Sequence, residues 1–175
     1  RLGEIEISVF GTGMHDPKSE KQFNLEKIRE IMEVNYFGTM NSINSVYEYY
    51  SNKKSGQISI ISSVAGYRGL PAAGAYCASK AALTSFAESL NFDMQIKNVR
   101  ISLISPGFIK TPMTDQNDFP MPMIKSPEFA AEQIYIGLIK KNGFEIHFPK
   151  TFTYLMKIIK ILPNWIYFGV INFGN

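Results

Sequence analysis

Cysteine is almost absent from this chain, since Cys77 is the single example among 175 residues. One thiol cannot close an internal disulfide, and no Cys/His pairing has the spacing of metal ligands, so a disulfide scaffold and a zinc site are not expected. No secretory leader or transit peptide is visible after Arg1. We therefore expect a cytoplasmic protein without a bound metal.

A large excess of charge of one sign is also absent, because 18 Lys and Arg stand against 15 Asp and Glu and the net charge is only +3. Such a small excess does not indicate nucleic-acid binding unless it is clustered, and the clustering here is confined to the end of the chain. No acidic residue follows Glu145, whereas Lys150, Lys157 and Lys160 do. We expect no nucleic-acid partner.

What the chain does contain is an alternation of apolar strands and amphipathic helices. Buried strands are predicted at 5–10, 57–62, 99–104 and 145–148, and helices at 25–50, 75–96, 151–162 and from Pro127 to Asn142-Gly143. Crossovers of this length predict an α/β fold with a doubly wound parallel sheet. We expect residues 1–150 to form one Rossmann-like domain, followed by a hydrophobic tail at 151–175.

Tyr76 and Lys80 lie four residues apart, so on a helix they share one face, where an ammonium favours the phenolate. The spacing alone is weak evidence, because Tyr49/Lys53 and Tyr50/Lys54 repeat it, and an exposed helix pair is the alternative. The difference is Ser63, which stands thirteen residues before Tyr76 at the carboxyl end of a buried strand. Open α/β sheets bind their ligands at such ends, although a serine there can also simply terminate a turn.

Two segments carry a resemblance to a known family: 60–66 reads IISSVAG and 75–82 reads AYCASKAA. Together they closely resemble the short-chain dehydrogenase/reductase family, which the chain matches over roughly residues 3–142. The resemblance implies that the Ser63 hydroxyl polarises a carbonyl and that Tyr76 transfers the proton. It also implies that Lys80 tunes Tyr76 and binds the nicotinamide ribose of NAD or NADP, of which we favour NADP. The expected reaction interconverts a carbonyl and a secondary alcohol.

Further site residues follow from the same resemblance. Asn35, on the inward stripe of its helix, is similar to the family asparagine that holds a proton-relay water; a satisfied core amide is the alternative. The segment 105–111 (SPGFIKT) corresponds to the nicotinamide-binding loop. The resemblance thus implies cofactor contacts from Gly13, Tyr76, Lys80, Pro106, Gly107, Ile109 and Thr111.

The substrate side is predicted to be apolar. Methionine, phenylalanine and proline are frequent between Thr111 and Ser126, where the family has a mobile lid, although ordinary packing explains them equally well. We expect substrate contacts from Ala65, Tyr67, Phe108 and Met113, and a small apolar ketone or alcohol as substrate.

The chain departs from the family in two places. The amino-terminal glycine-rich βαβ part is absent, so the sheet should end at the 5–10 strand, and we expect the chain to be part of a longer protein. The turn 10–13 reads FGTG where the family usually has Asn-Asn-Ala-Gly, so only Gly13 matches. That turn favours a second hypothesis, a non-enzymatic relative that binds a lipid, a membrane or a partner.

The tail at 151–175 combines an apolar arc with lysines and aromatics. Pro163 and Gly169 interrupt it, so no spanning helix of about 20 residues is available. It could lie on an anionic membrane surface, or it could pack over the substrate pocket or against a second subunit of a homo-oligomer. We favour packing.

Overall fold

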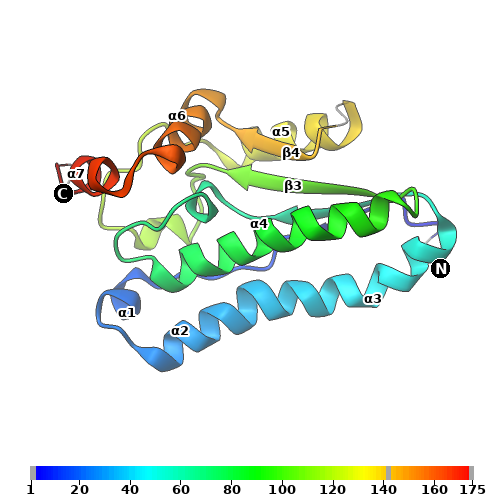
Figure 1. The fold of residues 1–175 in the computed structure, drawn as a ribbon, viewed down its shortest axis with the longest axis horizontal. Helices are drawn as coiled ribbons and strands as arrows, with labels where there is room; N and C mark the ends of the chain where they lie inside the picture. The colour runs from blue at the N-terminus through cyan, green and yellow to red at the C-terminus, as the bar shows by residue number, and fades with distance from the viewer. Residues whose placement is uncertain (1–2, 141–142, 174–175) are drawn as a thin grey trace.

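Four short parallel strands form the sheet of this protein, in the order β1-β2-β3-β4 (Figure 1). The computed structural model describes residues 3–140 and 143–173. The strands are β1 (Ile7–Phe10), β2 (Gln57–Ile61), β3 (Arg100–Pro106) and β4 (Glu145–Phe148). Because all three pairings are parallel, each connection is a crossover through helices. The predicted parallel α/β sheet is confirmed.

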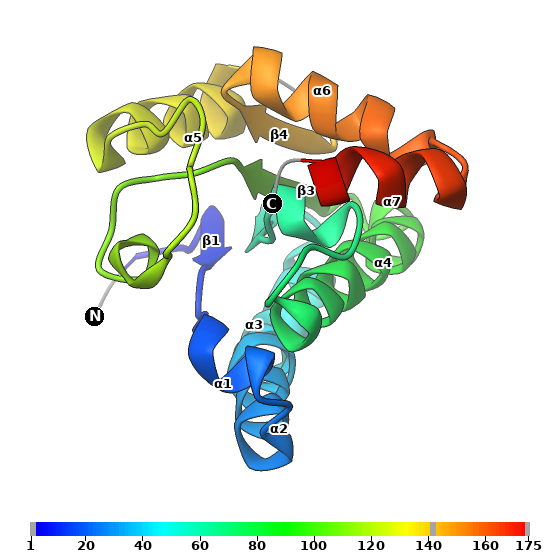
Figure 2. The same ribbon diagram turned by 90° about the vertical axis from the view of Figure 1, so that its left-hand side faces the viewer.

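Helices cover both faces of this sheet (Figures 1 and 2). One face carries α3 (Gly38–Lys53) and α4 (Gly74–Gln95), and the other carries α5 (Pro127–Lys140) and α6 (Lys150–Ile161). Alternate residues of β3 serve the two sides: Leu103 packs in the α3–α4 core and Ile104 in the α5 core. Period-two alternation of apolar residues on a doubly covered sheet produces this arrangement.

The helix predicted from Leu25 to Tyr50 is not a single α-helix. It consists of α2 (Leu25–Met32), a π-helical segment η1 (Glu33–Phe37) and α3. The apolar stripe is kept across the junction, so the sequence pattern did not reveal the extra residue that a π-turn inserts. Such turns are rare and are often found at functional sites, and this one holds Asn35.

Two helices were not predicted at all. The short α1 (Pro17–Lys21) lies in what the sequence indicated to be a loop, and α7 (Asn164–Phe173) follows Pro163 in the tail. Pro163 lies between the end of α6 and the start of α7 and marks a corner between two short helices, whereas Gly169 lies within α7. The predicted end of α5 at Asn142 lies outside the described residues.

None of the helices that the described residues form is long and apolar enough to cross a membrane.

The strand β1 forms one edge of the sheet. It pairs with β2, and no further strand within residues 3–140 and 143–173 pairs with it. Its Val9 side chain is 46% exposed, which agrees with the prediction that the sheet ends at this strand.

Candidate functional site

A pocket of about 600 Å³ opens at the carboxyl end of the sheet. The loops after β1, β2 and β3 contribute His15, Ser63 and Phe108, and the tail closes the opposite side with Phe152 and Ile171. Most of the lining is apolar, and Ser63 and Tyr76 supply hydroxyl groups within it. A cavity of this size and lining is typical of a small-molecule site.

Ser63 and Tyr76 are brought together in this pocket. Ser63 caps the short 3-10 helix η2 (Val64–Gly66), and its Oγ accepts a hydrogen bond from the Ala65 N–H at 3.1 Å. Burial raises the pKa of Tyr76, and a hydrogen bond with the Ser63 side chain acts in the opposite direction. The phenol is therefore held in its neutral, proton-donating form beside a second hydroxyl.

Lys80 lies one turn further along α4 and is buried. Its Nζ donates to the Ile61 carbonyl oxygen at 3.1 Å and lies 5.8 Å from the centre of the Tyr76 ring. Burial lowers the pKa of Lys80 to about 8. Gly13 leaves room beside it, because a Cβ at that position would come within 3.4 Å of the Lys80 Nζ and 3.7 Å of the Asn35 Oδ1.

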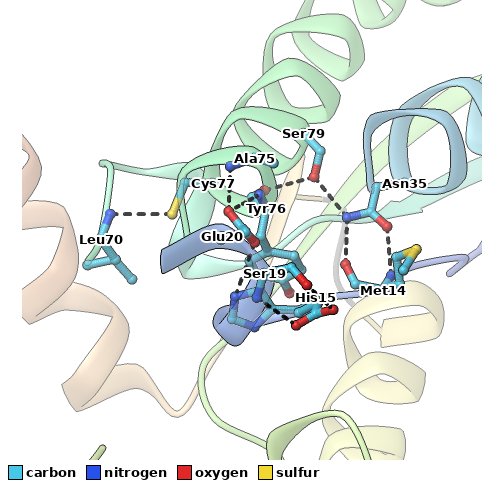
Figure 3. A network of polar contacts seen from close by, with 11 residues as sticks. Met14, His15, Ser19, Glu20, Asn35, Leu70, Ala75, Tyr76, Cys77 and Ser79 are labelled. Atoms are coloured by element: carbon cyan, nitrogen blue, oxygen red, sulfur yellow. Dashed lines mark hydrogen bonds and ion pairs between the residues drawn. The ribbon is translucent and has the colours of Figure 1, made fainter. Parts of the chain in front are cut away.

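Asn35 connects the loop after β1 to α4 (Figure 3). Its Oδ1 accepts from the Met14 N–H at 2.7 Å, and its Nδ2 donates to the Met14 carbonyl at 3.0 Å and to the Ser79 Oγ at 2.9 Å. Both donors and the carbonyl oxygen of this buried amide thus have protein partners. The side chain is a brace at the site, and the water-relay role stays a prediction.

The loop after β3 brings only part of the predicted cofactor segment to the pocket. The Gly107 N–H continues the β3–β4 ladder to the Phe148 carbonyl at 2.7 Å, and a Cβ on Gly107 would lie 2.8 Å from the Phe152 ring. Gly107 therefore lets α6 approach the pocket. Pro106, Ile109 and Thr111 are not among the lining residues, and the Thr111 N–H donates to the Thr114 Oγ1 at 2.9 Å.

Of the four predicted substrate residues, Ala65, Phe108 and Met113 line the pocket and Tyr67 does not. The Tyr67 ring packs instead under α6, and its hydroxyl donates to a Glu145 carboxylate oxygen at 2.5 Å. Burial raises the pKa of Tyr67. Tyr67 is close to Ser63 in the sequence, but it follows the 3-10 turn and its ring packs with Phe152 and Met156 of α6, so its contact with a substrate stays a prediction.

Sequence reasoning missed several residues that the structure places in or beside the pocket. His15 and Glu20 adjoin Tyr76, Ser79 bonds Asn35, and Val170 and Ile171 extend the lining from α7. Ser79 stood within the quoted 75–82 motif and could have been noted. The contacts of His15 and Glu20 span more than fifty residues, and no local pattern signals them.

The comparisons with known proteins agree with this geometry. The sequence model of the short chain dehydrogenase family matches residues 1–120 of this chain. The chain belongs to the short-chain dehydrogenase family. An uncharacterized oxidoreductase of Myxococcus xanthus is 33% identical over 162 residues, which cover 93% of this chain and 64% of that protein. A 3-ketodihydrosphingosine reductase of Bacteroides thetaiotaomicron is 28% identical, over 66% of this chain and 43% of its own length.

Solved short-chain dehydrogenases share the fold. One from Burkholderia cenocepacia, in complex with NADP, superposes with a TM-score of 0.73 at 23% identity and covers 90% of this chain and 65% of its own. One from Streptomyces avermitilis gives 0.71 at 18% identity, over 87% and 64%. The chain thus spans about two thirds of the length of these dehydrogenases and of its Myxococcus relative, and half that of a Staphylococcus epidermidis oxidoreductase.

Proposed function

We propose that the protein is an NAD(P)-dependent oxidoreductase that interconverts a carbonyl and a secondary alcohol. The observation that carries this proposal is that Ser63 and Tyr76 line one pocket and that the buried Lys80 lies beside them, with its Nζ 5.8 Å from the centre of the Tyr76 ring. Negative charge develops on the carbonyl oxygen during reduction, and two hydroxyls placed beforehand stabilise it. Ser63 donates a hydrogen bond to that oxygen and Tyr76 delivers the proton.

The residues around Lys80 fit a nicotinamide nucleotide. An ammonium has three donors, and one of them is used by the Ile61 carbonyl. The other two suit ribose hydroxyls, and Gly13 keeps the adjoining surface open. When bound, the nicotinamide supplies or accepts the hydride. By the family resemblance, Pro106, Gly107, Ile109 and Thr111 would contact its carboxamide or pyrophosphate, and Asn35 would keep the residues beside Lys80 in place. The Burkholderia structure of the same fold is a complex with NADP, and we favour NADP as the cofactor.

The pocket supports an apolar substrate. Phe108, Met113 and Phe152 present hydrocarbon surface, and Ser63 and Tyr76 supply hydroxyl groups that would meet a carbonyl. Binding energy from the apolar part then positions the reacting carbon. The name of the Bacteroides relative, a 3-ketodihydrosphingosine reductase, agrees with a ketone on an apolar molecule.

The test is hydride transfer by the full-length protein, followed through the absorbance of the reduced nicotinamide with a panel of apolar ketones. Tyr76→Phe removes the proton donor and should lower kcat by about 100-fold or more. Tyr135→Phe, on the exposed side of α5, is the matched control and should leave it unchanged. Undiminished turnover in Tyr76→Phe would contradict the proposal. Absence of thermal stabilisation by either nucleotide would instead favour the non-enzymatic hypothesis.

The tail packs over the pocket through Val170 and Ile171, while its outer side is apolar and open. Six side chains of α6 and α7 there are at least half exposed: Tyr154, Leu155, Ile158, Ile161, Trp165 and Phe168. The described tail also holds lysines and no acidic residue. We propose that this face of a cytoplasmic enzyme packs against a second subunit of a homo-oligomer, and contact with an anionic membrane surface is the alternative.

Liposome co-sedimentation of the full-length protein, with and without residues 151–175, tests the membrane contact. Equal binding by both forms would refute it. If the truncation changes the oligomeric state and not liposome binding, the face is the interface of a homo-oligomer.

A further inference from the structure

Two titratable side chains adjoin Tyr76 without a part in the proposed chemistry (Figure 3). The His15 ring lies against the Tyr76 ring, with centroids 4.6 Å apart and planes tilted by 32°, and it lines the pocket. Glu20, on α1, lies behind it, with its Oε1 3.4 Å from the His15 Nε2. Their side chains are only 9% and 2% exposed, so this contact is shielded from water.

Glu20 also caps the helix that carries Tyr76. Its Oε2 accepts hydrogen bonds from the Ala75 N–H at 2.6 Å and the Tyr76 N–H at 3.3 Å. The N-cap residue of α4, Ala73, offers no side-chain acceptor. Glu20 therefore supplies, from 55 residues away, the acceptor that the first turn of α4 lacks, and its negative charge suits the positive end of that helix.

We infer that Glu20 and His15 are positioning residues for Tyr76: Glu20 fixes the first turn of α4, and His15 holds the Tyr76 ring from the pocket side. The inference rests on the proposed function. It assigns to the loop between β1 and α2 a role in the reaction that no motif indicates.

The physical argument concerns the freedom of the Tyr76 hydroxyl. With both supports in place, the backbone of Tyr76 is fixed through its N–H and the ring is held by a flat neighbour on one side. Removal of either support lets the hydroxyl move relative to Ser63, and a displacement of about 1 Å can cost about 100-fold in rate. Substrate binding depends mainly on the apolar lining, so KM should change less than kcat.

The Glu20 arm of the test compares Glu20→Ala, Glu20→Gln and the exposed control Glu26→Gln in the full-length enzyme. Glu20→Ala should lower kcat by about 10- to 100-fold, and Glu20→Gln, which keeps a carbonyl acceptor, should recover part of it. Glu26→Gln should match the wild type. If all three variants have wild-type kcat, the inference is wrong.

A pH profile separates positioning from a general loss of folded enzyme. In alcohol oxidation Tyr76 accepts the proton, so the rate rises with pH as Tyr76 ionises. Burial is the main cause of the raised pKa of Tyr76, and the negative charge of Glu20 adds to it, so both Glu20 variants should move the rising limb of kcat/KM to lower pH. A fall in kcat with an unmoved limb would overturn the inference. The other titratable groups that face Tyr76 or the pocket are Cys77, Lys80, His15, Lys21 and Asp118.

The His15 arm compares His15→Leu with His15→Phe. Leucine removes the flat ring and should lower kcat about tenfold, while phenylalanine keeps it and should restore most of the rate. Equal rates in the two variants would remove His15 from the inference. A failure of the proposed function can be told apart from a failure of this inference. If the proposed function is wrong, Tyr76→Phe itself retains activity.

Discussion

Arg68 joins the loop after β2 to the corner between α6 and α7, and its removal should release α7 from the pocket. Its guanidinium donates to the carbonyl oxygens of Ile159 at 3.0 Å, Lys160 at 3.2 Å and Leu162 at 2.6 Å, and to the Asn164 Oδ1 at 2.6 Å. It also stacks 3.9 Å from the centre of the Tyr167 ring. These carbonyls lie at the end of α6, where the last carbonyl oxygens of a helix are incompletely paired; that of Ile159 also accepts from the Leu162 N–H at 3.3 Å.

The magnitude follows from the bonds that are shielded from water. Those to Ile159 and Leu162 are partly buried, and hydrogen bonds to charged groups contribute about 1.5–3 kcal/mol each. After allowance for replacement by water, Arg68→Ala should weaken the docking of α7 by about 3 kcal/mol. That corresponds to about 100-fold faster opening.

Hydrogen–deuterium exchange of the α7 amides measures this effect directly. Exchange in α7 should accelerate by about 100-fold, while α3 and α4 stay protected because their core is untouched. Since Val170 and Ile171 line the pocket, KM for an apolar substrate should rise as well. Arg29→Ala, on the exposed surface of α2, is the control. Unchanged α7 exchange in Arg68→Ala would refute the reasoning.

Two further predictions concern stability. Burial lowers the pKa of His147 to about 4, below its value of 6.5 in the unfolded chain, so its contribution to stability is present above pH 6.5 and is lost as pH falls through 4. The free energy of unfolding, measured with urea, falls in the wild type between pH 7.5 and pH 4.5, and in His147→Gln this fall should be smaller by on the order of 2 kcal/mol. An identical fall in the two proteins would contradict this prediction. Gly107→Ala places a Cβ 2.8 Å from the Phe152 ring and should destabilise the protein by about 1–3 kcal/mol in thermal unfolding. Gly169→Ala, where a Cβ meets nothing within 4 Å, should not, and equal effects of the two substitutions would show that the packing argument is wrong.

Most of the fold was predictable because its signals are local. The strand that ends before Ser63 and the helix that carries Tyr76 both show in periodicity, and their bounds shifted by only one residue in the structure. The π-turn around Asn35 was not predictable, because it preserves the apolar stripe on both sides. α7 was missed since Pro163 indicated an interruption, and only packing against Arg68 and Gly69 shows that a helix resumes.

The residues of the candidate site also fall into those that the sequence predicts and those that it does not. Order and spacing along the chain identify Ser63, Tyr76 and Lys80. Ser63 follows the end of a strand, and Tyr76 and Lys80 share one face of a helix. That Tyr67 does not line the pocket could not be read from the sequence, because the direction of a side chain after a 3-10 turn depends on the backbone there, and this one meets Glu145.

The sequence by itself determined a parallel α/β sheet, its strand-end serine and a tyrosine–lysine pair on one helix. Local periodicity and short motifs specify these features, because their energetics lie between near neighbours. Tertiary structure alone decided which distant groups support them: the Glu20 cap on α4, the His15 ring against Tyr76 and the Arg68 contacts that hold α7 over the pocket. Such contacts join residues more than fifty positions apart, so they depend on how the whole chain packs and leave no periodic trace in the sequence.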